Sequence, residues 1–202
     1  MKLILNFDIE MKLVFASNNK HKITEIQQLV GDKFQILSLE DIGCNVDIPE
    51  TADTIEGNAM LKAAYITNRY NMPCFADDTG LEISALHGEP GVYSARYAGL
   101  QRSAEDNMNL VLTNLKNETN RAAQFKTIIA LHLGQEQYVF EGIVKGQITL
   151  EKRGENGFGY DPIFQPEEDT KTFAQMTLEE KAAISHRARA VVKLIDFLER
   201  MF

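Results

Sequence analysis

Two adjacent carboxylates, Asp77 and Asp78, are the side chains of this sequence best suited to chemistry. They follow an apolar stretch that predicts a strand over 72–76, and Thr79 and Gly80 come directly after them. A carboxylate at the end of a buried strand is costly to desolvate unless a cation meets it there. A Mg²⁺ ion carrying a phosphorylated substrate is one such cation. An Asx-type turn between two strands, with no ligand, explains the same residues almost as well.

The spacing within this run constrains which groups can act together. Successive residues of a strand face opposite sides of the sheet, so we expect only one of the two carboxylates to enter a given site. The other would cap a turn or form an ion pair. Gly80 permits either a turn with a positive φ or a close approach of the backbone to a ligand.

A second candidate for ligand binding is the polar run over 17–22, SNNKHK. It follows an apolar stretch that predicts a strand over 13–16 and precedes helical periodicity that begins at Ile23. An asparagine at 18 or 19 is suited to cap the helix, whose free N–H groups and dipole favour an anion, and the lysines add charge. A capped helix with a solvated lysine face is an equally good interpretation of this run alone.

The C-terminal part of the chain carries further polar groups. The run GFGYDP over 157–162 presents two aromatic rings and an acid on a loop, although a simple turn before a strand accounts for it too. Thr177 and Glu180 have the spacing of a capping box. Ser185 would cap the next helix and place Arg187 in its first turn. Because a cation there opposes the helix dipole, it indicates an anionic or acceptor ligand beyond the helix end.

Strands and helices must position these groups. Alternating apolar residues predict a long strand over 125–133, which 134–136 would turn into a hairpin with a strand over 138–147. Caps and apolar runs predict further elements: strands at 35–37 and 163–164, and helices that begin after Asp53 or Thr54 and after Ser103.

Composition limits the classes of function. The chain has 202 residues, 44% hydrophobic and 25% charged, as expected for a globular domain with a substantial core. Its net charge of −8 disfavours a nucleic-acid partner, so an anionic ligand must meet a local basic cluster. The two cysteines match no metal or redox spacing, and no apolar run approaches the roughly 18 residues of a membrane span. We therefore expect a cytoplasmic protein with no membrane partner.

Four motifs taken together resemble the non-canonical purine nucleoside triphosphate pyrophosphatases, the inosine triphosphatases. They are SNNKHK at 17–22, ADDTG at 76–80, FGYDP at 158–162 and SHR at 185–187. The resemblance covers nearly the whole chain from Met11. It implies an elongated α/β fold with two lobes around a long mixed β-sheet, flanking helices and a central substrate cleft. It also implies a homodimer and Mg²⁺-dependent hydrolysis of ITP, dITP and XTP to the monophosphate and pyrophosphate, which would cleanse the nucleotide pool.

The resemblance implies roles for individual residues. Asp78 would be the proton acceptor and a Mg²⁺ ligand. Purine nucleoside triphosphate would be bound by Ser17, Asn18, Asn19, Lys20, His21, Lys22, Thr79, Phe158, Gly159, Tyr160, Asp161, Lys181, His186 and Arg187. Within this set, Lys22 would be the main phosphate cation, and a donor at His186 or Arg187 would pair with the 6-keto oxygen of the base.

One position departs from the family pattern. Many members read TFEENA where this chain reads TIEGNA over 54–59, so the usual metal-side glutamate aligns with Gly57. Glu56, one position away, is a candidate second Mg²⁺ ligand, or only a favourable acid in a first helical turn. Two rival functions remain: a pyrophosphatase for other modified nucleotides, and a nucleotide-binding protein that does not hydrolyse. The departure at Gly57 favours the second.

The first ten residues look like an extension. Met1-Lys2-Leu3 is echoed at Met11-Lys12-Leu13, and nothing within 1–10 is suited to chemistry. We expect a dispensable extension over 1–10 and a single domain over 11–202.

Overall fold

The computed structural model describes residues 12–31 and 34–201, so the expected extension over 1–10 lies outside the described residues. The strands are β1 (Lys12–Phe15), β2 (Gln35–Leu37), β3 (Cys74–Ile83), β4 (Pro90–Gly91), β5 (Ala122–Leu133), β6 (Glu136–Ile148) and β7 (Phe164–Pro166). They form one sheet in the order β2-β1-β3-β5-β6-β7, with β4 paired to β3 off this path. The sheet is mixed, because β1 is parallel to β2 and β3 while the other pairs are antiparallel.

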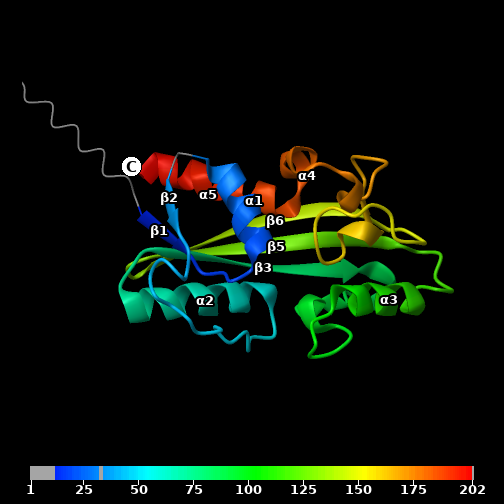
Figure 1. Ribbon diagram of the computed structural model, residues 1–202, viewed down its shortest axis with the longest axis horizontal. Helices are drawn as coiled ribbons and strands as arrows, with labels where there is room; N and C mark the ends of the chain where they lie inside the picture. Colours follow the sequence, from blue (N-terminus) through cyan, green and yellow to red (C-terminus); the bar gives the residue numbers. More distant parts are fainter. Residues whose placement is uncertain (1–11, 32–33, 202) are drawn as a thin grey trace, which may run out of the picture.

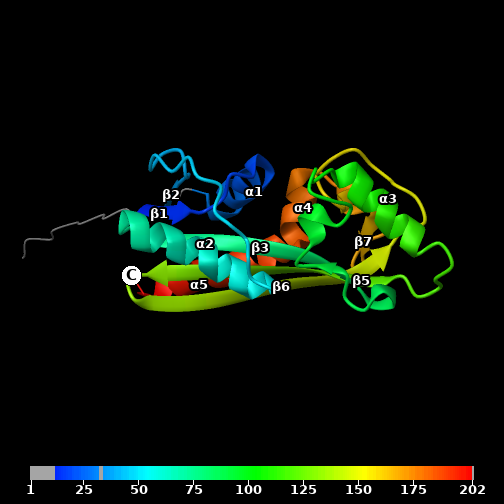
Figure 2. The ribbon, with the colours of Figure 1, turned by 90° about the horizontal axis from the view of Figure 1, so that it is seen from below.

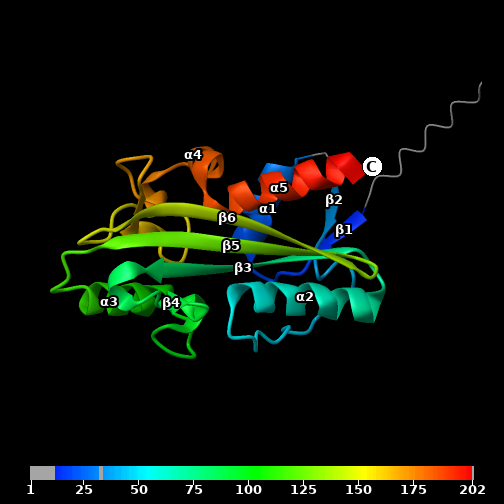
Figure 3. The same ribbon diagram turned by 180° about the vertical axis from the view of Figure 1, so that it is seen from behind.

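Helices cover both faces of the sheet. They are α1 (Lys20–Val30), α2 (Ile55–Tyr70), α3 (Ala104–Asn114), α4 (Leu178–Ile184) and α5 (His186–Met201), with short 3₁₀ turns at Ser84–Leu86, Ser94–Arg96, Asp161–Ile163 and Phe173–Gln175. Figures 1 and 3 show α1, α4 and α5 on one face and α2 and α3 on the other. No helix within 12–31 or 34–201 combines the length and apolarity that a membrane crossing needs.

Three apolar clusters divide the elongated molecule into two lobes. One cluster packs α2 on β1, β3 and β5, and a second packs α1 and α5 on the opposite face of the same strands. The third packs α3 and the segment 160–176 on the far ends of β3, β5 and β6. From below, β1, β2 and α1 lie toward one end and α3 and β7 toward the other (Figure 2). The expected α/β fold with a long mixed sheet is confirmed.

The central run of the sequence differs from expectation. Residues 74–83 form one uninterrupted strand, in which Asp77 and Asp78 pair with Ile129 and Ile128 of β5. The expectations of a strand end at the carboxylates and of an Asx turn are therefore wrong. Gly80 instead serves close packing, since a Cβ there would lie 2.6 Å from the Gly91 carbonyl oxygen of β4.

Most other local expectations are confirmed. The hairpin of β5 and β6 forms, and Thr177 and Glu180 make the capping box. The remaining caps form at expected residues: Asn19 rather than Asn18 on α1, Thr54 rather than Asp53 on α2, Ser103 on α3 and Ser185 on α5. The strand expected at 163–164 begins one residue late, because Ile163 closes the 3₁₀ turn that starts at Asp161.

The packing of α5 on β6 gives a testable consequence. A Cβ at Gly142 of β6 would overlap the carbonyl oxygen of His186 and the backbone nitrogen of Ala190. Overpacking of this kind costs about 1–3 kcal/mol. Gly142→Ala should therefore lower the melting temperature by several degrees, measured by thermal unfolding. Lys145→Ala, at an exposed position of the same strand, is the matched control, and an unchanged melting temperature for Gly142→Ala would contradict this packing.

Candidate active site

A cavity of about 510 Å³ opens between the two lobes. Its walls come from the turn between β1 and α1, the segment before α2, β3, the segment between β4 and α3, the loop before β7, and the start of α5. Fourteen of the predicted site residues line it: Ser17, Asn18, Asn19, His21, Lys22, Asp78, Thr79, Phe158, Gly159, Tyr160, Asp161, Lys181, His186 and Arg187. Segments far apart in the sequence thus meet at one site.

Two predicted site residues do not line the cavity. Lys20 is exposed at the first position of α1. Glu56 is exposed in the first turn of α2, because Thr54 begins that helix and leaves the Glu56 side chain on its solvent side. Glu56 therefore occupies the position of an acid that stabilises a helix N-terminus.

Asp77 lies behind the cavity wall, only 1% exposed. Its carboxylate accepts hydrogen bonds from Lys22 Nζ and from Arg187 Nε, each at 3.0 Å. Burial by itself raises the pKa of a carboxyl, but Lys22 and Arg187 outweigh it and hold the pKa of Asp77 well below its ordinary value. Asp77 is therefore ionised in the folded protein.

These contacts belong to a larger buried ion-pair network. Arg187 also pairs with Glu25 of α1, and Glu25 accepts a bond of 2.7 Å from Lys181 Nζ. Lys181 donates to Asp161 as well, at 2.7 Å. The six members are Lys22, Asp77, Arg187, Glu25, Lys181 and Asp161. With three cations and three carboxylates, the network is electrically neutral.

The network occupies the side chain of Arg187. Its Nε donates to Asp77, its Nη1 to Glu25 and its Nη2 to Thr79 Oγ1 at 3.2 Å. Arg187 is 1% exposed. The role predicted for it, a donor to the 6-keto oxygen, stays a prediction. Its truncation would in addition leave Asp77 and Glu25 with one cation each, Lys22 and Lys181, and the breaking of a buried pair costs roughly 3–5 kcal/mol.

On the other face of β3, Asp78 lines the cavity beside a second carboxylate that the sequence did not single out. Lys62 Nζ lies 2.7 Å from Glu50 Oε1 and 3.7 Å from Asp78 Oδ1. Burial raises the pKa of Asp78, and Lys62 offsets this only in part. Burial acts on Glu50 too, but there Lys62 outweighs it and the pKa is lowered. Two neighbouring carboxylates with pKa values moved in opposite directions are suited to separate roles.

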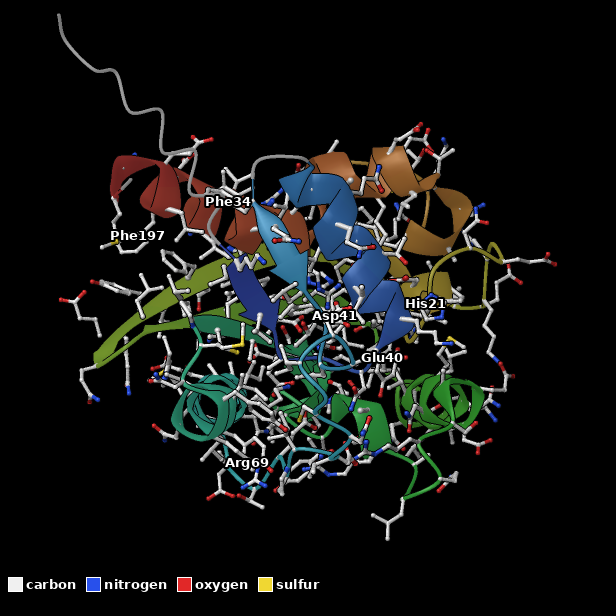
Figure 4. The ribbon with its side chains drawn as sticks, turned by 60° about the vertical axis from the view of Figure 1, so that its left-hand side comes forward. His21, Phe34, Glu40, Asp41, Arg69 and Phe197 are labelled. Carbon is white, nitrogen blue, oxygen red and sulfur yellow. The ribbon has the colours of Figure 1, made fainter. Side chains whose placement is uncertain are left out.

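Aromatic rings and the His186 imidazole line another part of the cavity. The rings of His21 and Phe158 stack with centroids 5.1 Å apart, and Lys181 Nζ lies 4.8 Å from the Phe158 centroid. Figure 4 shows His21 at the start of α1, directed toward the loop before β7. His186 Nδ1 lies 2.7 Å from Thr127 Oγ1. Burial holds the pKa of His186 well below its ordinary value, so the imidazole is neutral.

The donor set is suitable for Mg²⁺. Within the described residues, no three histidine, cysteine, aspartate or glutamate side chains gather into a metal site of their own. Mg²⁺ requires less, because it keeps several waters and uses one or two carboxylates together with substrate phosphates. Asp78 and Glu50, which share one ammonium group on the cavity wall, are such a pair.

Comparison with known proteins identifies the family. The family model described as the Ham1 family matches residues 13–197, so the chain belongs to the Ham1 family. It is 64% identical over 188 residues to a Flavobacterium johnsoniae protein named dITP/XTP pyrophosphatase, covering 93% of this chain and 98% of that protein.

Solved structures agree with this assignment. The Staphylococcus aureus Ham1 protein is similar with a TM-score of 0.86 and 43% identity, over 95% of this chain and 100% of that one. A HAM1 protein from Coxiella burnetii gives a TM-score of 0.87 and 36% identity, over 94% of this chain and 99% of that one.

The two faces of β3 predict different consequences for its two carboxylates. Asp77→Asn should lower the free energy of unfolding at neutral pH by roughly 3 kcal/mol or more, because Lys22 and Arg187 lose a buried partner. Since the pKa of folded Asp77 is depressed, its contribution is complete above the pKa of unfolded aspartate, about 3.9, and is lost as the pH falls below it. The variant should accordingly show a weaker acid dependence of stability, measured by denaturant unfolding between neutral and acid pH.

Asp78→Asn is the counterpart. It should abolish turnover and leave the melting temperature within a few degrees of wild type, because Asp78 contacts the cavity rather than the network. Equal losses of stability from both variants, or full activity of Asp78→Asn, would contradict this division.

Proposed function

We propose that this chain is a nucleoside triphosphate pyrophosphatase that hydrolyses ITP, dITP and XTP to the monophosphate and pyrophosphate. The observation that carries the proposal is the pairing of Asp78 with Glu50 around one lysine, in the same cavity as the Phe158 ring and a neutral His186. Carboxylates beside a cation suit a metal-bound phosphate chain, and an aromatic face with a fixed polar group suits a purine. The name of the Flavobacterium johnsoniae relative supports this assignment.

Cleavage between the α- and β-phosphates needs an in-line water, a base and neutralisation of charge. Asp78 is the candidate base, because burial raises its pKa and so increases its affinity for the proton of the water. Lys62 places a positive charge beside it. The start of α1, next to Ser17 and Asn18, suits the binding of phosphate oxygens through the positive end of its helix dipole.

Mg²⁺ would be held by Asp78 and Glu50, with Glu50 in place of the Glu56 considered from the sequence. When bound, the ion supplies positive charge to the phosphate oxygens and lowers the electrostatic cost of the attack. Lys62 already brings these two carboxylates within reach of one cation.

Selection of the base would follow from hydrogen-bond polarity. A 6-keto purine presents an acceptor where adenine presents an amino donor. A neutral His186, with one ring nitrogen beside Thr127, can donate to the keto oxygen in only one tautomer. A donor left unpaired by adenine would cost on the order of 1–3 kcal/mol, or roughly 5- to 150-fold in discrimination.

A cytoplasmic location and a homodimer complete the proposal. Both described cysteines are free and buried, which agrees with a reducing compartment. Leu100 and Leu150 are 90% and 78% exposed, so large apolar side chains are available on the surface of the described chain for a second copy to cover.

Pyrophosphate release from ITP, XTP and ATP, with Mg²⁺ and with a chelator, tests the proposed function. We expect release from ITP and XTP far above that from ATP, and only when Mg²⁺ is present. Faster release from modified pyrimidine triphosphates would support the first rival function, and tight ITP binding without release would support the second.

The same assay separates Glu50 from Glu56. Glu50→Gln should raise the Mg²⁺ concentration needed for half-maximal activity by at least about tenfold, because changing even an outer-shell partner of a metal ligand costs roughly 10- to 100-fold in affinity. Glu56→Gln, which removes an exposed charge from the same region of the chain, is the matched control and should not shift the titration. A shift with Glu56→Gln alone would reverse the assignment.

A further inference from the structure

Arg102 lines the same cavity and interacts electrostatically with Glu50. It directly precedes Ser103, the N-cap of α3, and Ala104 and Asn107 of that helix line the cavity beside it. The Arg102 side chain is exposed. Arg102 lies outside the four sequence motifs on which the site was predicted.

Arg102 differs from the other cations of the cavity in having no ion pair within the described part of the chain. Five lysine and arginine side chains line the cavity: Lys22, Lys62, Arg102, Lys181 and Arg187. Four of them are ion-paired, to Asp77, Glu50, Asp78, Glu25 and Asp161. Among the described residues, Arg102 has no ion pair and no side-chain hydrogen bond; only a longer-range electrostatic interaction with Glu50 is present.

The difference matters for binding an anion. A buried lysine or arginine that turned toward a phosphate would leave its own carboxylate without compensation, which is costly. The neutral six-residue network therefore has little charge to offer. Arg102 can pair with a phosphate and lose only water, and its planar guanidinium presents two parallel donors to phosphate oxygens.

The backbone at Arg102 adds a second, independent observation. Its φ is 52°, in the left-handed region that non-glycine residues adopt rarely and at a cost. Glycine would adopt this conformation freely, yet an arginine stands here. Residues with such a backbone conformation cluster at ligand sites, where the surrounding structure holds the backbone in place.

We propose that Arg102 binds the β- and γ-phosphates of the substrate, the part that leaves as pyrophosphate. The inference rests on the proposed function. The α-phosphate must lie within reach of the base, Asp78, so a cation at the exposed rim near Glu50 meets the distal phosphates instead. Arg102 would then increase the affinity for the triphosphate substrate over that for the monophosphate product, which lacks the β- and γ-phosphates. Substrate would therefore displace product more readily.

Calorimetric titration of the full-length protein with pyrophosphate and, separately, with IMP tests this assignment, both in the presence of Mg²⁺. Arg102→Ala should weaken pyrophosphate binding by about ten- to a hundredfold, the worth of hydrogen bonds to a charged donor, and change IMP binding less than about twofold. The KM for ITP should rise accordingly. Arg102→Gly, which suits the positive φ, should give the same result and separates loss of charge from backbone strain.

Lys116→Ala, which removes an exposed cation of the same lobe outside the cavity, is the control and should bind both ligands as wild type does. Equal weakening of IMP and pyrophosphate would overturn the assignment, as would wild-type affinity for pyrophosphate in both Arg102 variants or no pyrophosphate binding by the wild type. If wild type binds pyrophosphate through Arg102 but releases none from ITP, the site stands and the proposed reaction fails.

Discussion

The neutral network of Lys22, Asp77, Arg187, Glu25, Lys181 and Asp161 is the constraint on which the site depends. It joins α1, β3, α4, α5 and the loop before β7 through buried ion pairs. A charge taken out of water is tolerated only when it is paired and hydrogen-bonded. Every member therefore fixes the place of its neighbours, and through them the cavity wall.

The strand β3 places its two adjacent carboxylates in different surroundings. Asp77 turns into the network, and Asp78, its neighbour, turns to the cavity and to Lys62. The period of two along a strand is enough to place adjacent carboxylates in different environments. One is held ionised by two cations, while burial raises the pKa of the other. The proposed base, Asp78, thus directly follows the carboxylate that holds the network together.

Local signals in the sequence were sufficient for much of this structure. Caps such as Asn19 and Thr54 and the alternation in β5 depend on neighbouring residues, and they were predicted correctly. The resemblance of four motifs indicated most of the residues that line the cavity. Each of these signals is contained within a short stretch of chain.

Features that depend on distant contacts were not predictable in the same way. β3 continues through both carboxylates because Lys22 of α1 and Arg187 of α5 pair with Asp77. Neither cation is close to residue 77 in the sequence, so the local pattern could not predict this pairing. Glu50, which precedes α2, is linked to Asp78 of β3 by Lys62 of α2, which lies close to both carboxylates. Nothing near Glu25 in the sequence distinguishes it from an acid on a helix surface, and its partner Arg187 lies 162 positions further along the chain.

A double-mutant cycle on the free energy of unfolding tests the central claim, that Asp77 and Arg187 act as one buried pair within a neutral network. Asp77→Asn and Arg187→Met each remove one charge and leave an uncompensated partner, whereas the double variant leaves two cations and two carboxylates. The network predicts that the double variant is more stable than the sum of the single losses, by roughly 1–3 kcal/mol. Additive losses would contradict it.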